Sequence, residues 1–377
     1  MILGDFGAEV LRVEEPPGSP RHRAEEAAWG VRSVQEARRW AAFNPLNRNK
    51  RSIALNLKHP EGRRILHQLC KEADIFVEQF RPGVVQRLGC DYETLSRLNP
   101  RLIYCSISGY GQEGPYRNLV GHDINYISLG GALGLVGPKG GEPVIPYNII
   151  ADYAAGGLQA VVGILIALLA REKTGRGQYV DMAMLDGVIY LLAVVFAEYF
   201  AQGVVPRRGE MRLNGGVPYY NVYECKDGEY ISLGCIESPF WQNLCRALGR
   251  EDFIPSQHDA DAYPDIFAAF RRIFKTRTRD EWWEYLYSLG DIAVGKVYRL
   301  DEVIQDPQVR ERKMVLEVGQ LDGEIVRQVG IGPKLAETPG EVRSLGVPTG
   351  AHTDEVLRSL GYTPEQLKRL REEGVIA

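Results

Sequence analysis

The sequence has few cysteines, and none is spaced for metal binding. Its 377 residues include six, at positions 70, 90, 105, 225, 235 and 245, and no two of them form a CxxC pair. Zinc sites usually need such closely spaced pairs, so we expect no bound metal. Because the cysteines fall within predicted strands and helices, we expect buried, reduced thiols and a cytoplasmic protein.

An excess of positive charge is also absent. The 45 Lys and Arg residues are outnumbered by 49 Asp and Glu residues, which gives a net charge of -4. This balance excludes a general attraction to nucleic acid or to an anionic membrane, so any basic site must be local. Internal repeats, low-complexity segments and a signal peptide are not visible either. The length allows two or three domains with a sizeable core.

The apolar runs are poor candidates for a membrane span. The uncharged stretch 153–170 has the length of a helix of about five turns, but it contains three glycines and a glutamine. We therefore expect a buried core helix and no membrane span. Asp152 directly precedes this run and occupies the position of an N-cap, a role for which Asp is preferred.

A histidine and an aspartate thirty residues apart are the candidate catalytic residues. His122 stands beside Asp123, and Asp152 opens the apolar helix. One candidate base and one candidate acid in a local unit indicate proton transfer. Plainer interpretations stay open at this point, because Asp152 can serve only as a cap and His122 can be a hydrogen-bonded structural residue.

The alternation of strands and helices predicts an α/β fold. Strands are expected at 8–14, 52–57, 74–78, 102–109 and 177–184, and helices at 60–73, 153–170 and 185–202. This order predicts a large domain, residues 1–200, with a doubly wound, Rossmann-like parallel sheet.

A second domain is predicted where the pattern changes. A hairpin at 219–234 turns at Asp227-Gly228, and helices at 238–248 and 279–289 follow. We expect a small α+β domain at 201–320. Residues 321–377 then return to the large domain through a strand at 322–332 and helices at 353–360 and 363–373.

Basic residues gather at the ends of the predicted strands. Lys58 lies at a strand-to-helix junction, and Arg87 lies in the helix that follows the next strand. Open α/β sheets bind phosphates at such junctions, which predicts a phosphate-bearing ligand. The cluster of Arg48, Lys50 and Arg51 nearby has an alternative interpretation as solvated surface.

Six dispersed segments, in the right order, resemble the class III CoA-transferase (CaiB/BaiF) superfamily. They are RNKRSIALNLK, EQFRPGVVQRLG, NPRLIYCSISGYGQEGP, TGRGQYVDMAMLDG, ETPGEVRSLG and AHTDEVLRSLGYT. Within it, GHDINY, ADYAAGG and CIES resemble the α-methylacyl-CoA racemase branch. The catalytic pair of that branch is the histidine of GHD and the aspartate of AD, here His122 and Asp152.

The resemblance implies a CoA-binding enzyme. The candidate CoA contacts are Leu55, Asn56, Leu57, Lys58, Phe80 and Arg87, together with Lys50 of the basic cluster. Glu237 is implied to reach the active site from the small domain. The resemblance also implies an interlocked homodimer, with each active site between the large domain of one subunit and the small domain of its partner. No cofactor is expected beyond the CoA of the substrate.

Two reactions fit this resemblance. A racemase needs a base and an acid on opposite faces of the α-carbon, and donors for the enolate oxygen. His122 and Asp152 would supply the faces, Asp123 or Glu237 would orient His122, and backbone N–H groups after Asp152 would bind the enolate. In the transferases, the residue matching Asp152 is instead a nucleophile that forms acyl anhydride and CoA thioester intermediates.

Other features depart from the racemase pattern. Glu15 stands where racemases tend to carry an arginine, which brings the transferase alternative closer. The family normally begins about twenty residues earlier, so we expect either a start site assigned too late or a missing first strand. A non-catalytic acyl-CoA-binding protein is the third alternative, and the acyl group itself is not determined by the sequence.

Overall fold

The computed structural model describes residues 1–377 except 21, 24–26 and 28–29. The described chain forms two compact units. The first contains Met1–Ser108, Leu158–Met182 and Glu302–Ala377, and the second contains Gly109–Gly157 and Ala183–Asp301. The units follow tertiary contacts, whereas the predicted domain boundaries at residues 200 and 320 followed changes in composition. The two divisions therefore cut the chain at different points.

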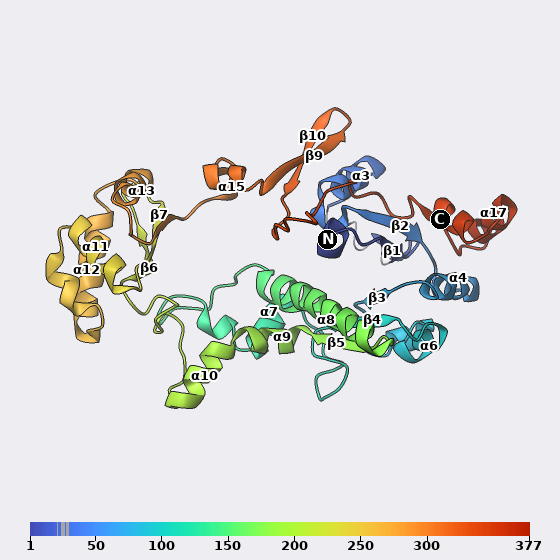
Figure 1. The fold of residues 1–377 in the computed structure, drawn as a ribbon, viewed down its shortest axis with the longest axis horizontal. Coiled ribbons are helices and arrows are strands. Elements are labelled where there is room, and N and C mark those ends of the chain that lie inside the picture. The colour runs from blue at the N-terminus through green and yellow to red at the C-terminus, as the bar shows by residue number, and fades with distance from the viewer. Residues whose placement is uncertain (21, 24–26, 28–29) are drawn as a thin grey trace. The chain divides into compact units, whose positions relative to one another are not determined.

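Parallel strands form two sheets in the first unit (Figure 1). In one sheet β1 (Val10–Glu14) pairs in parallel with β2 (Lys50–Ala54). In the other, β3 (Ile75–Glu78) pairs in parallel with β4 (Ile103–Ser108), whose second neighbour is β5 (Tyr179–Ala183). The prediction of a mixed α/β fold with parallel strands is confirmed. The strands are nevertheless divided between two sheets, where a single sheet was predicted.

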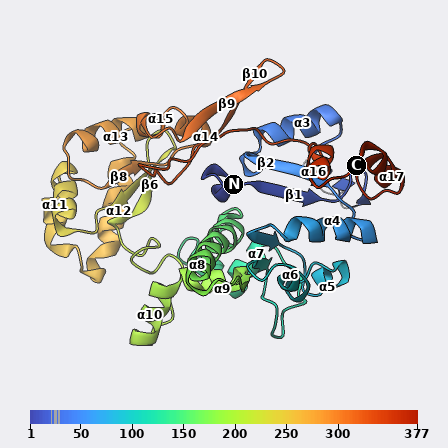
Figure 2. The same ribbon diagram turned by 45° about the vertical axis from the view of Figure 1, so that its right-hand side comes forward.

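The first unit also contains α-helices. They are α1 (Ile2–Asp5), α3 (Val34–Phe43), α4 (Pro60–Cys70), α5 (Val84–Leu88), α6 (Tyr92–Leu98), α8 (Gln159–Thr174), α15 (Pro307–Glu311), α16 (Thr353–Ser359) and α17 (Pro364–Glu372). The core joins apolar side chains of β2 and β4 to those of the two C-terminal helices, including Ile53, Tyr104, Leu357 and Leu370. Helix α16 contacts β2 and α17, and Figure 2 shows both helices near β2. The C-terminal helices therefore complete the core of the first unit.

A hairpin replaces the single strand predicted at 322–332. Strand β9 (Val315–Leu321) pairs antiparallel with β10 (Glu324–Val329). The turn between them is Asp322-Gly323, and both residues have positive φ angles, 51° and 84°. An Asp-Gly pair with this backbone is typical of a two-residue hairpin turn. The short helix α14 (Leu300–Val303) precedes this C-terminal part of the chain.

The second unit contains a run of helices and a three-stranded antiparallel sheet. Its helices are α7 (Asp123–Leu129), a π-helix (Ile149–Leu158), α9 (Met184–Leu191), α10 (Ala193–Gln202), α11 (Ser238–Ala247), α12 (Tyr263–Phe274) and α13 (Arg279–Ser288). The helix predicted at 185–202 is broken at Leu192, where α9 and α10 meet at a bend of 60°.

The predicted hairpin of the second unit is confirmed. Strands β6 (Tyr220–Glu224) and β7 (Tyr230–Gly234) pair antiparallel, and β8 (Val294–Lys296) pairs with β7. Trp282 and Leu286 of α13 are buried in the core beneath them.

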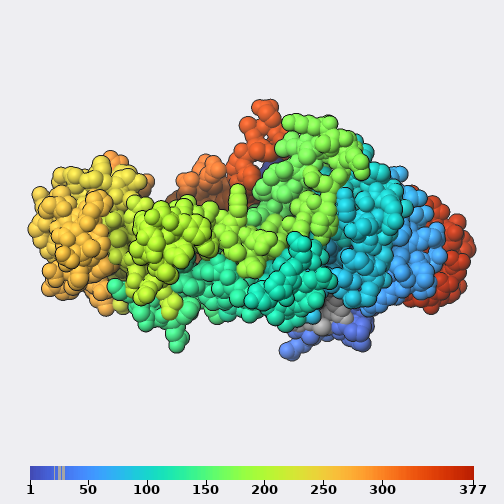
Figure 3. Space-filling model, turned by 90° about the horizontal axis from the view of Figure 1, so that it is seen from below, coloured from blue at the N-terminus to red at the C-terminus, as the bar shows by residue number. Residues whose placement is uncertain are grey.

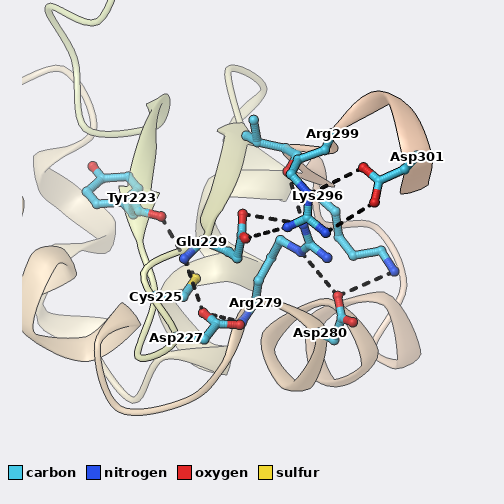
Figure 4. A network of polar contacts seen from close by, with 10 residues as sticks. Tyr223, Cys225, Asp227, Glu229, Arg279, Asp280, Lys296, Arg299 and Asp301 are labelled. Carbon is cyan, nitrogen blue, oxygen red and sulfur yellow. Dashed lines mark hydrogen bonds and ion pairs between the residues drawn. The ribbon is translucent and has the colours of Figure 1, made fainter. Parts of the chain in front are cut away.

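A buried arginine ties this sheet to α13 (Figure 4). Arg279 is 5% exposed and donates to the carbonyl oxygen of Val297 at 3.1 Å. Its guanidinium forms ion pairs with Asp280 at 3.2 Å and with Glu229 at 3.8 Å. A buried charge is costly unless it is paired, so this network holds the hairpin turn against the start of α13.

The apolar helix differs from the prediction in two respects. The α-helical part begins at Gln159, because residues 149–158 are π-helical. Asp152 is therefore inside the first turn of a π-helix, and the interpretation of Asp152 as an N-cap is wrong. Only one face of α8 is buried in this chain, through Ala160, Ile164 and Ala167.

The opposite face of α8 is apolar and exposed. Val162, Leu165, Ile166 and Leu169 have exposed fractions of 46–69%, and their spacing places them along one stripe. By length and composition, Ile149–Thr174 is the one continuous helix among the described residues that could cross a membrane, and α9 with α10 could count as another if the bent pair formed one span. Core helices of soluble proteins have the same length and composition.

Candidate active site

His122 lies at the N-terminal end of α7 with an exposed side chain. Its backbone N–H donates to Asn125 Oδ1 at 3.0 Å. The chain just before it is fixed by close packing, because the Tyr126 hydroxyl donates to the carbonyl oxygen of Gly121 at 2.6 Å. A Cβ at Gly121 would collide with the rings of Tyr110 and Tyr126. The backbone that leads into His122 is thus positioned by a glycine and two tyrosines.

Asp123 links α7 to the π-helix. It is 4% exposed, and its Oδ2 accepts hydrogen bonds from the N–H of Ala151 at 2.7 Å and of Asp152 at 3.0 Å. The N-terminal N–H groups of a helix lack partners within the helix, and an acidic side chain satisfies them. The Asp123 carboxylate therefore links the segment that follows His122 to the segment that carries Asp152.

Asp152 has an exposed side chain that is held from one side. Asn148 Nδ2 donates to Asp152 Oδ2 at 2.9 Å. Within the described chain, Asp152 Oδ1 makes no hydrogen bond, so this oxygen can meet a ligand. Sequence reasoning missed Asn148, although its place four residues before Asp152 is the spacing at which helical side chains meet.

The π-helix packs tightly on α9. A Cβ at Gly187 would lie 2.5 Å from the carbonyl oxygen of Ala155, and one at Gly156 would lie 3.0 Å from Met184. Ala151, Ala155 and Val188 are fully buried between the two helices. π-Helical geometry is rare and is frequent at functional sites, and here small residues permit it beside Asp152.

Glu237 lies elsewhere in the second unit. It is the N-cap residue of α11, after β7, and its side chain is exposed. In the described part of the chain, no hydrogen bond or ion pair joins Glu237 to His122. The predicted orientation of His122 by Glu237 is therefore not seen within one subunit.

The candidate CoA residues Leu55, Asn56, Leu57 and Lys58 form the loop after β2. Asn56 N–H donates to Val375 at 2.8 Å, and a Cβ at Gly62 would collide with the carbonyl oxygen of Asn56. The loop is thus held between α4 and the C-terminus. Leu55 is buried and the Lys58 side chain is exposed, 3.5 Å from Glu15.

Phe80 and Arg87 follow the end of β3. Phe80 is half-buried against the core of the first unit, and its N–H donates to the Glu78 carboxylate at 2.7 Å. Burial raises the pKa of Glu78, against the hydrogen bonds from Ser106 and Phe80. Arg87 is exposed on α5. Lys58, which is paired with Glu15, and Arg87 thus both place a cation after a parallel strand, where phosphates bind.

Lys50 lies at the other end of β2. It is the first residue of that strand, roughly 16 Å of extended chain from Leu55. There it lines a cavity of about 340 Å³ with Arg51, Arg343 and His352. Burial lowers its pKa, and the charge of Arg12 lowers it further. The structure does not bring Lys50 together with Lys58.

The described residues contain no group of three or more His, Cys, Asp or Glu side chains placed to hold a metal ion. The six cysteines are all buried and unbridged. Burial raises the pKa of the Cys105 thiol to about 12, so these thiols are poor nucleophiles.

Comparison with known proteins identifies the family. The sequence model of CoA-transferase family III matches residues 1–353. The chain belongs to CoA-transferase family III. It is 35% identical over its whole length to the human α-methylacyl-CoA racemase, of which it covers 92%. It is 34% identical, again over its whole length, to the β subunit of the Chloroflexus aurantiacus succinyl-CoA–L-malate CoA-transferase, of which it covers 93%.

Solved structures show the same fold. A CaiB/BaiF family protein from Brucella suis matches with a TM-score of 0.81 and 29% identity, over 95% of this chain and 93% of that chain. Family III proteins use CoA thioesters as substrates. The chain is thus an enzyme of the family III transferase or racemase type, and its relatives of both types are similar to nearly the same degree.

Proposed function

We propose that this family III member is an α-methylacyl-CoA racemase-like enzyme that epimerises the α-carbon of a 2-methylacyl-CoA. The observation that carries the proposal is the link made by Asp123. This residue follows the exposed His122 in the chain, and its carboxylate holds the N–H of the exposed Asp152. Similarity to the human racemase over the full chain supports the same reaction.

The proposed chemistry is proton transfer through an enolate. An α-proton beside a thioester is a weak acid, so a base must remove it on one face while an acid returns a proton on the other. His122 and Asp152 serve the two faces and exchange roles with the direction of the reaction. Asp152 Oδ1 meets the substrate, while Oδ2 stays on Asn148.

Deuterium exchange tests this proposal. A single enantiomer of a 2-methylacyl-CoA, incubated with the enzyme in deuterated water, should gain deuterium at the α-carbon and form the opposite enantiomer. Absence of exchange from both enantiomers, over a panel of acyl groups, would refute the racemase proposal. Tight CoA binding with neither activity would indicate a binding protein.

We expect His122→Ala to lower the rate of racemisation by a factor of about 10² to 10⁴, because one face of the α-carbon loses its acid or base. Exchange should survive for the enantiomer whose α-proton faces Asp152. His258→Ala is the control, because this exposed histidine of the second unit lies outside the site, and it should change neither rate. Racemisation by His122→Ala at the parent rate would contradict the assignment.

CoA transfer is the second candidate. The exposed, half-bonded carboxylate of Asp152 also suits a nucleophile that forms an aspartyl-CoA thioester, and the Chloroflexus transferase is almost as similar as the human racemase. A transferase would show no α-exchange without an acceptor acid. Hydroxylamine would trap its intermediate as the hydroxamate of Asp152, and His122→Ala would only weaken it.

We also infer how the substrate and a second subunit bind. Lys58 and Arg87 contact the phosphates of CoA, and Phe80 packs against the nucleotide. The exposed apolar stripe of α8 supports the homodimer that the resemblance implies; in Figure 3 the green segment that includes α8 lies at the surface. The interlocked arrangement, a doubly wound large domain and a cytoplasmic location remain part of this proposal.

A further inference from the structure

The segment that carries Asp152 has an unusual backbone. Residues Ile149–Leu158 form ten residues of π-helix, whereas π-helical geometry mostly occurs as single-turn bulges. In a π-helix each N–H bonds five residues back, so the first five N–H groups have no partner within the helix. Asp152 belongs to this first turn. Its backbone depends on groups outside the helix.

The Asp123 carboxylate supplies that support with one oxygen. Asp123 Oδ2 accepts both the Ala151 and the Asp152 N–H groups, at 2.7 and 3.0 Å. Asp123 Oδ1 is buried and, in the described chain, has no hydrogen-bond partner. The Asp123 side chain thus points toward the backbone of Asp152, although Asp123 follows His122 directly in the chain.

The residues before Asp152 add a second restraint. Tyr147 has a φ of 57°, which is uncommon for a residue other than glycine, and this turn leads directly into Asn148. Asn148 then holds Asp152 Oδ2 at 2.9 Å. Asp123 fixes the backbone of Asp152 and Asn148 fixes one carboxylate oxygen, so Asp152 Oδ1 is left with a defined direction.

We propose that Asp123 is the positioning residue of Asp152, and not of His122. This inference deepens the proposed function and rests on it. Proton transfer requires the acid and base within hydrogen-bond reach of the carbon, and a misplacement of about 1 Å costs about 100-fold in rate. Loss of the Asp123 carboxylate would release the first turn of the π-helix and displace Asp152, while His122 keeps its own bond to Asn125.

The two faces of the α-carbon make this testable. Deuterium exchange is measured at early times from each enantiomer of a 2-methylacyl-CoA separately. The reference variants are His122→Ala and Asp152→Asn, each of which removes exchange from one enantiomer and so identifies the face that each group serves.

Asp123→Ala should reproduce the pattern of Asp152→Asn. Exchange at the Asp152 face should fall about 100-fold through kcat, exchange at the His122 face should change much less, and KM should stay nearly constant. Asp123→Asn is the matched control. Its amide oxygen can accept both N–H bonds, as Oδ2 does, so exchange at both faces should stay within about tenfold of the parent.

Selective loss at the His122 face in Asp123→Ala would overturn the proposal, and so would an equal loss at both faces. Both faces are measured on the same folded molecules, so a stability defect lowers them together. If Asp123→Ala does not fold, Asp123→Glu, which moves the carboxylate by one methylene, should give the same asymmetry. Absence of exchange in the parent would instead count against the racemase function. The proposal would then be tested by hydroxamate formation at Asp152, which Asp123→Ala should slow and Asp123→Asn should not.

Discussion

Single residues in this protein combine structural and binding roles. Glu78 is 6% exposed at the end of β3, and it accepts the N–H of Phe80, a candidate CoA contact. Burial raises the pKa of this carboxyl, although hydrogen bonds from Ser106 and Phe80 oppose the shift. The position of Phe80 therefore depends on a group whose charge is costly to bury.

We expect Glu78→Gln to alter the pH dependence of stability. The Glu78 carboxyl loses its proton at about pH 4.5 in the unfolded state but at a higher pH in the folded state. Between these two pKa values, rising pH therefore lowers the free energy of unfolding. Gln does not titrate. The variant should thus gain stability relative to the parent as the pH rises above about 4.5. Urea unfolding at several pH values measures this, and a constant difference would contradict it.

At the scale of elements, close approaches between backbones place the loop 55–58, which we propose as a CoA contact. Gly62 of α4 lies against the carbonyl oxygen of Asn56, and the C-terminal residue Val375 holds the Asn56 N–H. The loop 55–58 is therefore positioned by two elements that come after it in the chain.

We expect Gly62→Ala to lower the free energy of unfolding by about 2 kcal/mol, because the new methyl group forces α4 away from the loop. CoA affinity should fall as well. Gly332→Ala is the control, since a Cβ there meets no atom within 4 Å. Urea unfolding and CoA titration measure the two effects. If Gly62→Ala is destabilised but binds CoA as tightly as the parent, the loop does not contribute to CoA binding.

At the scale of the whole molecule, one chain leaves much apolar surface uncovered. Only 28% of the most apolar window of Ile149–Thr174 is buried within the chain. A helix that is apolar on all sides is normally covered on all sides. The exposed stripe of α8 therefore supports the proposed homodimer.

The parent should sediment at twice the 42.2 kDa of one chain. Ile166→Glu together with Leu169→Glu should shift the protein toward monomer, because two buried charges without partners oppose association. Lys173→Glu, an exposed position on the same helix, should leave the mass unchanged. A monomeric parent would refute the dimer.

The amino-acid sequence alone determined the strand and helix alternation, the Asp227-Gly228 hairpin and the candidate pair His122 and Asp152, because these depend on local periodicity, turn chemistry and residue type. Tertiary structure decided the rest. The π-helix around Asp152 arises from the distant carboxylate of Asp123 and from packing on α9, and no local pattern encodes either contact. The same holds for Lys50 and Lys58, because Lys50 begins β2 and Lys58 lies in the loop beyond its other end. The extended strand separates two basic residues that are near in sequence.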